Sequence, residues 1–398
     1  MSRLDELIAE LCPNGVEYKA IGEIATSFFR GSGIKREDLT EDGSPCIRYG
    51  EIYTTYGIWF DSCISHTKIE KIVSPKYVEY GDILFAITGE SVEEIAKSTA
   101  YLGRERCLVG GDIVVLRHQQ NPKYISYALA TTDAQRQKSA GKVKSKVVHS
   151  SIPSISAIRI PIPPLPVQQE IVRILDSFTE LTEKLTAELT ARKKQYEYYR
   201  KSLLSFGPQV TWGILGGLGK VSMCKRIMKD ETSVEGDVPF YKIGTFGKKP
   251  DAYITREKYE EYKTKYSYPK KGDILISAAG TIGRAVIFDG EPSYFQDSNI
   301  VWLANDETKV LNSFLYYWYQ TNPWKVATGG TIARLYNDNI AGAKVPLLPI
   351  EEQKRIVNAL NRLNTICTDF TSGLPAEIAA RQKQYEYYRD KLLTFKEA

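Results

Sequence analysis

The sequence predicts a mixed α+β protein made of two similar globular domains separated by two long helices. Residues 191–206 (ARKKQYEYYRKSLLSF) and 380–395 (ARQKQYEYYRDKLLTF) are identical at 12 of 16 positions and lie 189 residues apart in a chain of 398. Shorter matches link the two halves in the same order. An internal repeat of this spacing decides the architecture, and we expect a pseudo-twofold protein with domains at 1–160 and 207–345 and helical regions at 161–206 and 346–398.

The bulk composition is that of a soluble globular protein. Hydrophobic residues make up 42% of the chain and charged residues 25%, with no apolar run long enough to cross a membrane. The N-terminus (MSRLDELIAEL) is acidic and amphipathic, unlike a signal peptide, so we expect a cytoplasmic protein. The net charge is only +5, so binding to nucleic acid must depend on local patches.

Cysteine and histidine usage argues against disulfides and metal. The scattered cysteines form no CxxC pair, and in a cytoplasmic protein we expect all of them to be reduced thiols. They are Cys12, Cys46, Cys63, Cys107, Cys224 and Cys367. The three histidines, His66, His118 and His149, do not cluster with them. We therefore expect no structural zinc site.

The two halves begin with matching segments. A short helix is expected over 4–11, after which VEYKAIGEI at 16–24 corresponds to VTWGILGGL at 210–218. GDILFAITG at 81–89 corresponds to GDILISAAG at 272–280. Each of these last two segments predicts a turn, a buried strand and a second tight turn.

The remaining matches complete a domain of mixed helices and strands. In order they are a buried strand (112–116 and 299–303), a helix (near 122–138 and 309–321) and a polar, glycine-containing loop (139–151 and 327–338). Each half then has roughly 150 residues, a usual size for one domain.

Proline-rich segments lead into the long helices. IPIPPLP at 160–166 cannot lie inside a helix, and we expect a helix from Val167 to Phe206 after it. A PxxP ligand is an alternative interpretation, but the repeated position favours a structural linker. The second copy is four residues longer and contains Gly373 and Pro375, which we expect to break or kink its helix.

Apolar positions seven residues apart predict that the long helices pack on each other as an antiparallel coiled coil. The alternative is an ordinary structural amphipathic helix that buries a stripe of tyrosine and leucine. The expected stripe comprises Ile171, Phe178, Leu185, Leu189, Tyr196, Tyr199 and Leu203, and in the second copy Ile356, Leu363, Phe370, Ile378, Tyr385, Tyr388 and Leu392.

A search for catalytic motifs finds little. No phosphate-binding GxxxxGK[ST] occurs, and GILGGLG at 213–219 lacks the strand–GxGxxG–helix context of a dinucleotide site. Asp251, Glu261 and Lys263 fit the loose pattern of a metal-dependent nuclease. The alternative for this segment is a solvated charged helix, REKYEEYKTK, and the first half does not keep the pattern.

Basic segments are the better functional signal. No acid occurs from Ala134 to Gln169 or from Thr308 to Asn337. The first of these segments contains Arg136, Lys138, Lys142, Lys144, Lys146 and Arg159. Such loops can follow phosphates and place a few side chains in a groove. An ordinary surface loop is the alternative, but two similar basic domains suit a ligand with two similar sites, such as duplex DNA.

The chain resembles the specificity subunit of type I restriction-modification systems. The resemblance rests on the helix starts PPLPVQQEIV (163–172) and LLPIEEQKRIV (347–357), on LTAELTARKKQYEYYR and LPAEIAARQKQYEYYR, and on CPNGVEYKAIGEI. It implies two target-recognition domains that each read half of a split DNA site, and helices that set the spacer and dock the methyltransferase subunits.

The resemblance further implies a non-catalytic subunit without metal or cofactor of its own. Methyltransferase subunits would use S-adenosylmethionine to modify adenine, and a restriction subunit would translocate and cut with ATP and Mg²⁺. A protein-interaction scaffold is the rival interpretation, and a nuclease is a second. The DNA contacts that we expect, mostly to phosphate, are Arg30, Lys35, Arg48, Lys142, Lys144 and Lys146, and in the second half Lys225, Arg226, Lys242, Lys325 and Arg334.

Overall fold

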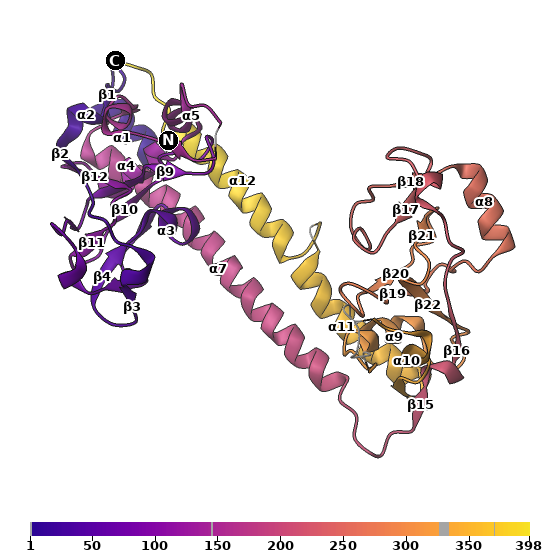
Figure 1. Cartoon of the computed structure of the whole chain (residues 1–398). Helices are drawn as coiled ribbons and strands as arrows, with labels where there is room; N and C mark the ends of the chain where they lie inside the picture. The colour runs from indigo at the N-terminus through magenta and orange to yellow at the C-terminus, as the bar shows by residue number, and fades with distance from the viewer. Residues whose placement is uncertain (1, 145, 326–333, 370) are drawn as a thin grey trace. The chain divides into compact units, whose positions relative to one another are not determined.

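The computed structural model describes residues 2–144, 146–325, 334–369 and 371–398 (Figure 1). It divides into two compact units, the first comprising Met1–Thr186 with Glu377–Ala398 and the second Ala187–Ala376. Each unit contains one of the predicted globular halves. Within the described residues, every helix is too short or too polar to cross a bilayer.

Two five-stranded sheets form the centre of the first unit. The first sheet has the order β2 (Ala25–Arg30), β12 (Ile113–His118), β8 (Ile83–Ala86), β10 (Ser98–Tyr101) and β5 (Trp59–Phe60). The second has the order β3 (Leu39–Thr40), β6 (Ser65–Thr67), β4 (Ser44–Ile47), β11 (Cys107–Val109) and β7 (Tyr77–Val78).

Alternation along the central strands explains why both faces of the first sheet are buried. Ile83 and Phe85 belong to one hydrophobic cluster, whereas Leu84 and Ala86 belong to another. Successive side chains of a strand point to opposite faces. The short apolar run predicted at GDIL therefore packs into two hydrophobic clusters, one on each face of the sheet. Gly81 before this strand has φ +93° and Gly272 in the second half has φ +91°, which confirms the two matching turns.

Short helices and strand pairs complete the first unit. Strand β1 (Tyr18–Ala20) pairs with β14 (Arg159–Pro161), and β9 (Thr88–Gly89) pairs with β13 (Val148–His149). The helices are α1 (Arg3–Leu11), α2 (Ile21–Ile24), α3 (Tyr49–Thr54), α4 (Pro122–Leu129), α5 (Thr132–Ser139) and α6 (Ile152–Ser156), with 3₁₀ turns at Arg36–Asp38 and Ile69–Lys71.

One predicted helix is in fact two. The expected helix near 122–138 ends at Leu129, and Thr131 starts α5 by accepting a hydrogen bond from the backbone N–H of Ala134. Threonine favours this capping position because its hydroxyl satisfies a free amide of the first turn. The prediction of one continuous helix was therefore wrong.

The second unit repeats the same plan with fewer strands. Its sheets have the orders β16 (Gly219–Ser222), β22 (Ile300–Asn305), β19 (Ile274–Ser277), β20 (Ala285–Ile287), and β18 (Tyr253–Ile254), β17 (Val238–Tyr241), β21 (Tyr294–Phe295). A further pair joins β15 (Trp212–Ile214) to β23 (Lys344–Pro346). The helices are α8 (Arg256–Lys265), α9 (Asn312–Tyr319) and α10 (Asn337–Ala341), with 3₁₀ turns at Leu215–Gly217 and Lys229–Glu231.

The two halves also share a close approach at a glycine. A Cβ on Gly22 would lie 3.2 Å from the Cβ of Ser156, and a Cβ on Gly216 would lie 3.1 Å from the Cβ of Ala341. Each glycine thus lets the opening segment of its half contact the short helix that precedes the proline-rich junction. This common requirement explains why the glycine occurs at the same place in both copies.

The long helices are confirmed, including the break in the second copy. Helix α7 (Leu165–Leu203) has 39 residues and measures on the order of 60 Å. The second copy is divided into α11 (Ile350–Thr368) and α12 (Leu374–Leu392). A Cβ on Gly373, which lies between them, would come within 2.6 Å of the carbonyl oxygen of Asp369, so only glycine fits there.

A buried glutamine attaches each long helix to its globular domain. The Gln168 side chain is fully buried. Its Oε1 accepts a hydrogen bond from the backbone N–H of Asn121 (3.1 Å), and its Nε2 donates one to the backbone carbonyl of Pro163 (2.7 Å). Gln353 does the same with the Leu311 amide (2.8 Å) and the Leu348 carbonyl (2.8 Å). Backbone groups that no regular element satisfies are thus paired at both junctions.

Within the first unit, α12 runs antiparallel to the first part of α7 (Figure 1). Phe178 stacks on Tyr388 with ring centroids 5.5 Å apart, and Tyr385 lies 6.3 Å from Tyr127 of α4. Helix α12 therefore packs both on α7 and on the globular domain. A coiled coil along the whole length of the helices remains a prediction.

The predicted stripe residues differ in burial. Ile171, Ile356 and Tyr385 are buried, and Tyr199 is 41% exposed. The half-buried positions are Phe178, Leu185, Leu189, Tyr196, Leu203, Leu363, Ile378, Tyr388 and Leu392. Phe370 lies outside the described residues. Tyr196 and Leu203 pack against the core of the second unit, so part of the stripe is buried against its own domain.

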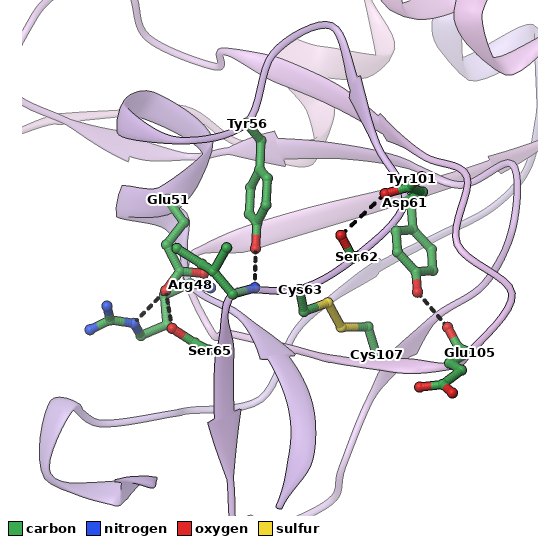
Figure 2. The surroundings of a disulfide bond; sticks show 11 residues. Arg48, Glu51, Tyr56, Asp61, Ser62, Cys63, Ser65, Tyr101, Glu105 and Cys107 are labelled. Atoms are coloured by element: carbon green, nitrogen blue, oxygen red, sulfur yellow. Dashed lines mark hydrogen bonds and ion pairs between the residues drawn. A yellow bond between two sulfur atoms is a disulfide. The ribbon is translucent and has the colours of Figure 1, made fainter. Parts of the chain in front are cut away.

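The cysteines differ from the expectation of six reduced thiols. Figure 2 shows a disulfide between Cys63 and Cys107, which are separated by 44 positions in sequence. Cys107 lies in β11, and Cys63 lies in the loop that precedes β6 of the same sheet. The fold brings together two cysteines whose spacing carries no disulfide signature, so that prediction was wrong for this pair. The other four cysteines are free and buried.

Candidate nucleic-acid interface

A basic, glycine-lined pocket of about 570 Å³ opens in the first unit. It is lined by Arg30, Gly31, Gly33, Ile34, Lys35, Arg36, Arg48, Tyr49, Gly50, Gly110, Gly111 and Asp112. Three of the six predicted contacts of this half, Arg30, Lys35 and Arg48, therefore lie at one site. Cationic side chains beside unobstructed backbone suit a phosphate-bearing ligand.

The pocket lies where one end of the first sheet meets one end of the second sheet. Strand β2 ends at Arg30, and the loop from β11 to β12 carries Gly110 and Gly111. A Cβ on Gly31 would lie 2.2 Å from the carbonyl oxygen of Gly110, so glycine is required for the two backbones to approach. The absence of side chains at these positions leaves the pocket open.

Carboxylates hold two of the three arginines that line the pocket, Arg30 and Arg48. Arg30 Nη2 lies 2.8 Å from Asp112 Oδ1, and the Arg30 side chain remains 59% exposed. Arg48 Nε lies 3.1 Å from Glu51 Oε1, and Glu51 also accepts a hydrogen bond from Ser65 Oγ (2.6 Å). Each guanidinium has five N–H donors, so donors remain available to a ligand. Lys35 is exposed and lies 3.8 Å from Glu37.

The basic loop after α5 lies beside one end of the first sheet. Strand β13, at the end of this loop, pairs His149 with Thr88 of β9, which follows the buried strand β8. Lys144 and Lys146 are exposed and Lys142 is half-buried, whereas residue 145 lies outside the described residues. Lys138, which belongs to the same acid-free stretch, is only 4% exposed and cannot form part of a basic surface.

The second unit places an arginine and a carboxylate at the corresponding loop. Arg226 Nε lies 2.9 Å from Asp297 Oδ2, in the loop from β21 to β22. Arg334 Nη2 donates to Asn299 Oδ1 (3.0 Å) and Ser298 Oγ (3.2 Å) of the same loop. The loop from β21 to β22 corresponds to the loop from β11 to β12, so each domain places an arginine beside a carboxylate of this loop. The residue that matches Asp112 is Asn299, which Arg334 contacts.

The other predicted contacts of the second unit are dispersed. Lys242 lies 2.8 Å from Asp251, and the Lys225 ammonium stands 5.3 Å from the centre of the Tyr266 ring. Lys325 is exposed, and the segment 326–333 that follows it lies outside the described residues. Asp112 and Asp297 were not predicted as part of a site. Both lie shortly before a buried strand, in GGDIVV and DSNIVW, but the residue that matches Asp112 is Asn299.

The nuclease pattern does not assemble into a metal site. Asp251 pairs with Lys242, whereas Glu261 pairs with Lys265 at 3.0 Å on helix α8. Among the described residues, no group of three or more potential ligands could hold a metal ion. The segment 256–265 is a helix, as the alternative interpretation predicted.

Comparison with known proteins identifies one family for both halves of the chain. The family described as the type I restriction modification DNA specificity domain matches twice, at residues 13–191 and 210–380. A putative type I restriction enzyme specificity subunit of Haemophilus influenzae is 57% identical over 264 residues, which are 64% of this chain and 68% of that protein. The EcoR124I/EcoR124II specificity subunit of Escherichia coli is 34% identical over 266 residues, 61% of this chain and 65% of that protein.

Solved structures share the fold. A chain from a study of complex assembly and conformational transition of the type I R-M system aligns with a TM-score of 0.61 and 18% identity, over 96% of this chain and 98% of that one. The S subunit of a type I restriction-modification system from M. genitalium aligns with a TM-score of 0.51 and 16% identity, over 96% and 97%. These alignments show the same fold over 96% of the chain.

Proposed function

Because the chain belongs to the family of type I restriction modification DNA specificity domains, we propose that its two domains each read one half of a split site in duplex DNA. The observation that carries this proposal is the repeated loop between two sheets, where Arg30 pairs with Asp112 and Arg226 with Asp297. Two similar cationic sites suit a ligand with two similar halves.

Contacts to phosphates and contacts to bases contribute differently to recognition. Exposed lysines such as Lys144 contact phosphate oxygens, which supplies affinity without sequence information. Arg30 and Arg48 at the pocket are oriented by their carboxylates, and an oriented guanidinium can donate two hydrogen bonds to the edge of guanine in the major groove. Positions that the protein does not touch can still be selected through DNA shape.

The long helices set the distance between the half-sites, and the chain itself performs no chemistry. Methyltransferase subunits dock on the helical segments 167–206 and 350–395 and modify adenine with S-adenosylmethionine. A restriction subunit adds ATP- and Mg²⁺-dependent translocation and cutting. This assembly acts in the cytoplasm, and the specificity chain needs no cofactor or metal of its own.

The charge contacts are tested by the salt dependence of DNA binding. Lys144→Ala removes an exposed cation from the basic loop, and each lost phosphate contact lowers the slope of log K against log salt by about 0.9. We expect weaker binding to all sequences and a shallower slope, measured by fluorescence anisotropy. Lys354→Ala is the control, because Lys354 lies on α11 in an ion pair with Glu351 (2.8 Å). An unchanged slope for Lys144→Ala would remove this loop from the interface.

A further inference from the structure

A second cavity of the first unit lies apart from the basic pocket. Its volume is about 710 Å³, which is within the usual size of small-molecule sites. The globular domain and helices α7 and α12 all contribute to its wall. It is lined by Thr55, Tyr56, Gly57, Ile58, Trp59, Phe60, Glu93, Glu94, Lys97, Ser98, Ala130, Gln135, Lys138, Thr179, Thr182, Glu183, Gln382, Tyr385 and Arg389.

The cavity contains a buried lysine, Lys138, that has no counterion among the described residues. Lys138 is 4% exposed, and its Nζ donates to the Leu129 carbonyl (2.8 Å) and to Ser98 Oγ (3.2 Å). An ammonium has three donors, so one remains unused. Among the described residues, no carboxylate forms an ion pair with Lys138, and burial lowers its pKa to about 7. Buried charges are ordinarily paired, so this lysine points to a missing anion.

A second polar group on the wall lacks an acceptor for its proton among the described residues. Tyr385 is 6% exposed, and the charged group near its hydroxyl is Arg389, which can only donate. An unpaired buried hydroxyl is destabilising, so a ligand that accepts its hydrogen bond recovers that loss. Two independent groups of the same cavity, one on α5 and one on α12, therefore lack an acceptor.

The remaining wall defines the class of ligand. The charged side chains around Lys138 come from the loop before β10 (Glu93, Glu94, Lys97), from α7 (Glu183) and from α12 (Arg389). With Lys138 protonated these charges cancel, so a bound monoanion leaves the site with one net negative charge and a dianion with two, which disfavours the dianion. Residues 56–60 add an apolar, aromatic surface. We propose that the cavity binds a small monocarboxylate with a flat apolar body, whose carboxylate pairs with Lys138 and accepts a hydrogen bond from Tyr385.

Calorimetry on the full-length chain tests this site with benzoate. Benzamide, which has the same shape without the charge, and inorganic phosphate are the matched controls. At pH 8 Lys138 is mostly neutral before binding, so benzoate binding should take up close to one proton, seen as a heat that depends on the buffer. Affinity should fall by up to tenfold per pH unit above about pH 7. The proposal is overturned if benzoate does not bind at millimolar concentration, or if benzamide binds equally well.

Two variants separate the site from a general effect on folding. Lys138→Met should abolish benzoate binding and proton uptake, and Tyr385→Phe should weaken binding several-fold. Tyr196→Phe is the control because Tyr196 occupies the equivalent position of the repeat in the second unit. Benzoate binding that survives Lys138→Met would refute the assignment. If that variant does not fold, equal affinities for Tyr385→Phe and Tyr196→Phe would refute it instead. DNA recognition does not depend on either outcome.

Discussion

Replacing Gln168 by methionine tests how the long helix is attached to the first domain. The substitution keeps the approximate length of the side chain but leaves the Asn121 amide and the Pro163 carbonyl without their partner. Each buried, unpaired group costs about 1–3 kcal/mol. Because Asn121 is only half-buried, we expect the two unpaired groups together to cost about 2–4 kcal/mol of stability, in the lower part of the range for two fully buried groups.

Hydrogen–deuterium exchange of the full-length chain is the assay, since it reports each unit separately. A loss of about 2–4 kcal/mol corresponds to roughly 30- to 900-fold less protection in peptides of α4, with peptides of α9 unchanged. Gln353→Met should produce the reverse pattern. Gln169→Met is the matched control because its side chain is exposed. If Gln168→Met and Gln169→Met exchange alike, water replaces the buried amide and the reasoning fails.

Three further predictions follow from single features of the fold. His118 has its pKa lowered to about 4 by burial; its neutral form is favoured in the folded state, so it contributes stability above about pH 6.5 that is lost as the pH falls towards 4. His118→Gln should flatten this part of the pH–stability curve, whereas the exposed His149→Gln should not, as measured by urea denaturation. Cys63→Ser should lower the unfolding free energy by about 2–4 kcal/mol under oxidising conditions and by much less with reductant, and equal losses in both would argue against the disulfide. Inserting four residues within 182–191 lengthens α7 by about 6 Å and should change the preferred DNA spacer by one or two base pairs of about 3.4 Å; an unchanged spacer in methylation mapping would contradict the helix as a ruler.

Much of the architecture could be predicted because the two halves of the chain can be compared with each other. Two copies of one plan expose the features that both need, such as the GDIL strand, the glycine pair Gly22 and Gly216, and the proline-rich entry to each helix. Local chemistry also identified the break near Gly373 and the charged helix at 256–265. These features depend on neighbours in sequence, where propensity and steric rules apply directly.

The features that were missed depend on contacts between distant residues. Gln168 and Lys138 are polar, and nothing in their local sequence distinguishes them from surface residues, yet both are buried. Arg30 meets Asp112 across 82 positions, and Cys63 meets Cys107 across 44. Such pairs become visible only after the strands have been placed side by side, because the sheet order is not the chain order.

The central claim is that one chain reads two half-sites at a fixed separation, and methylation mapping tests it most directly. The chain would be co-expressed with the methyltransferase subunit of its own genome, and N6-methyladenine would be located by long-read sequencing. We predict a split motif of two short defined sequences around an unspecified spacer. A continuous motif, or no new methylation when both proteins are soluble and purify together, would contradict the account.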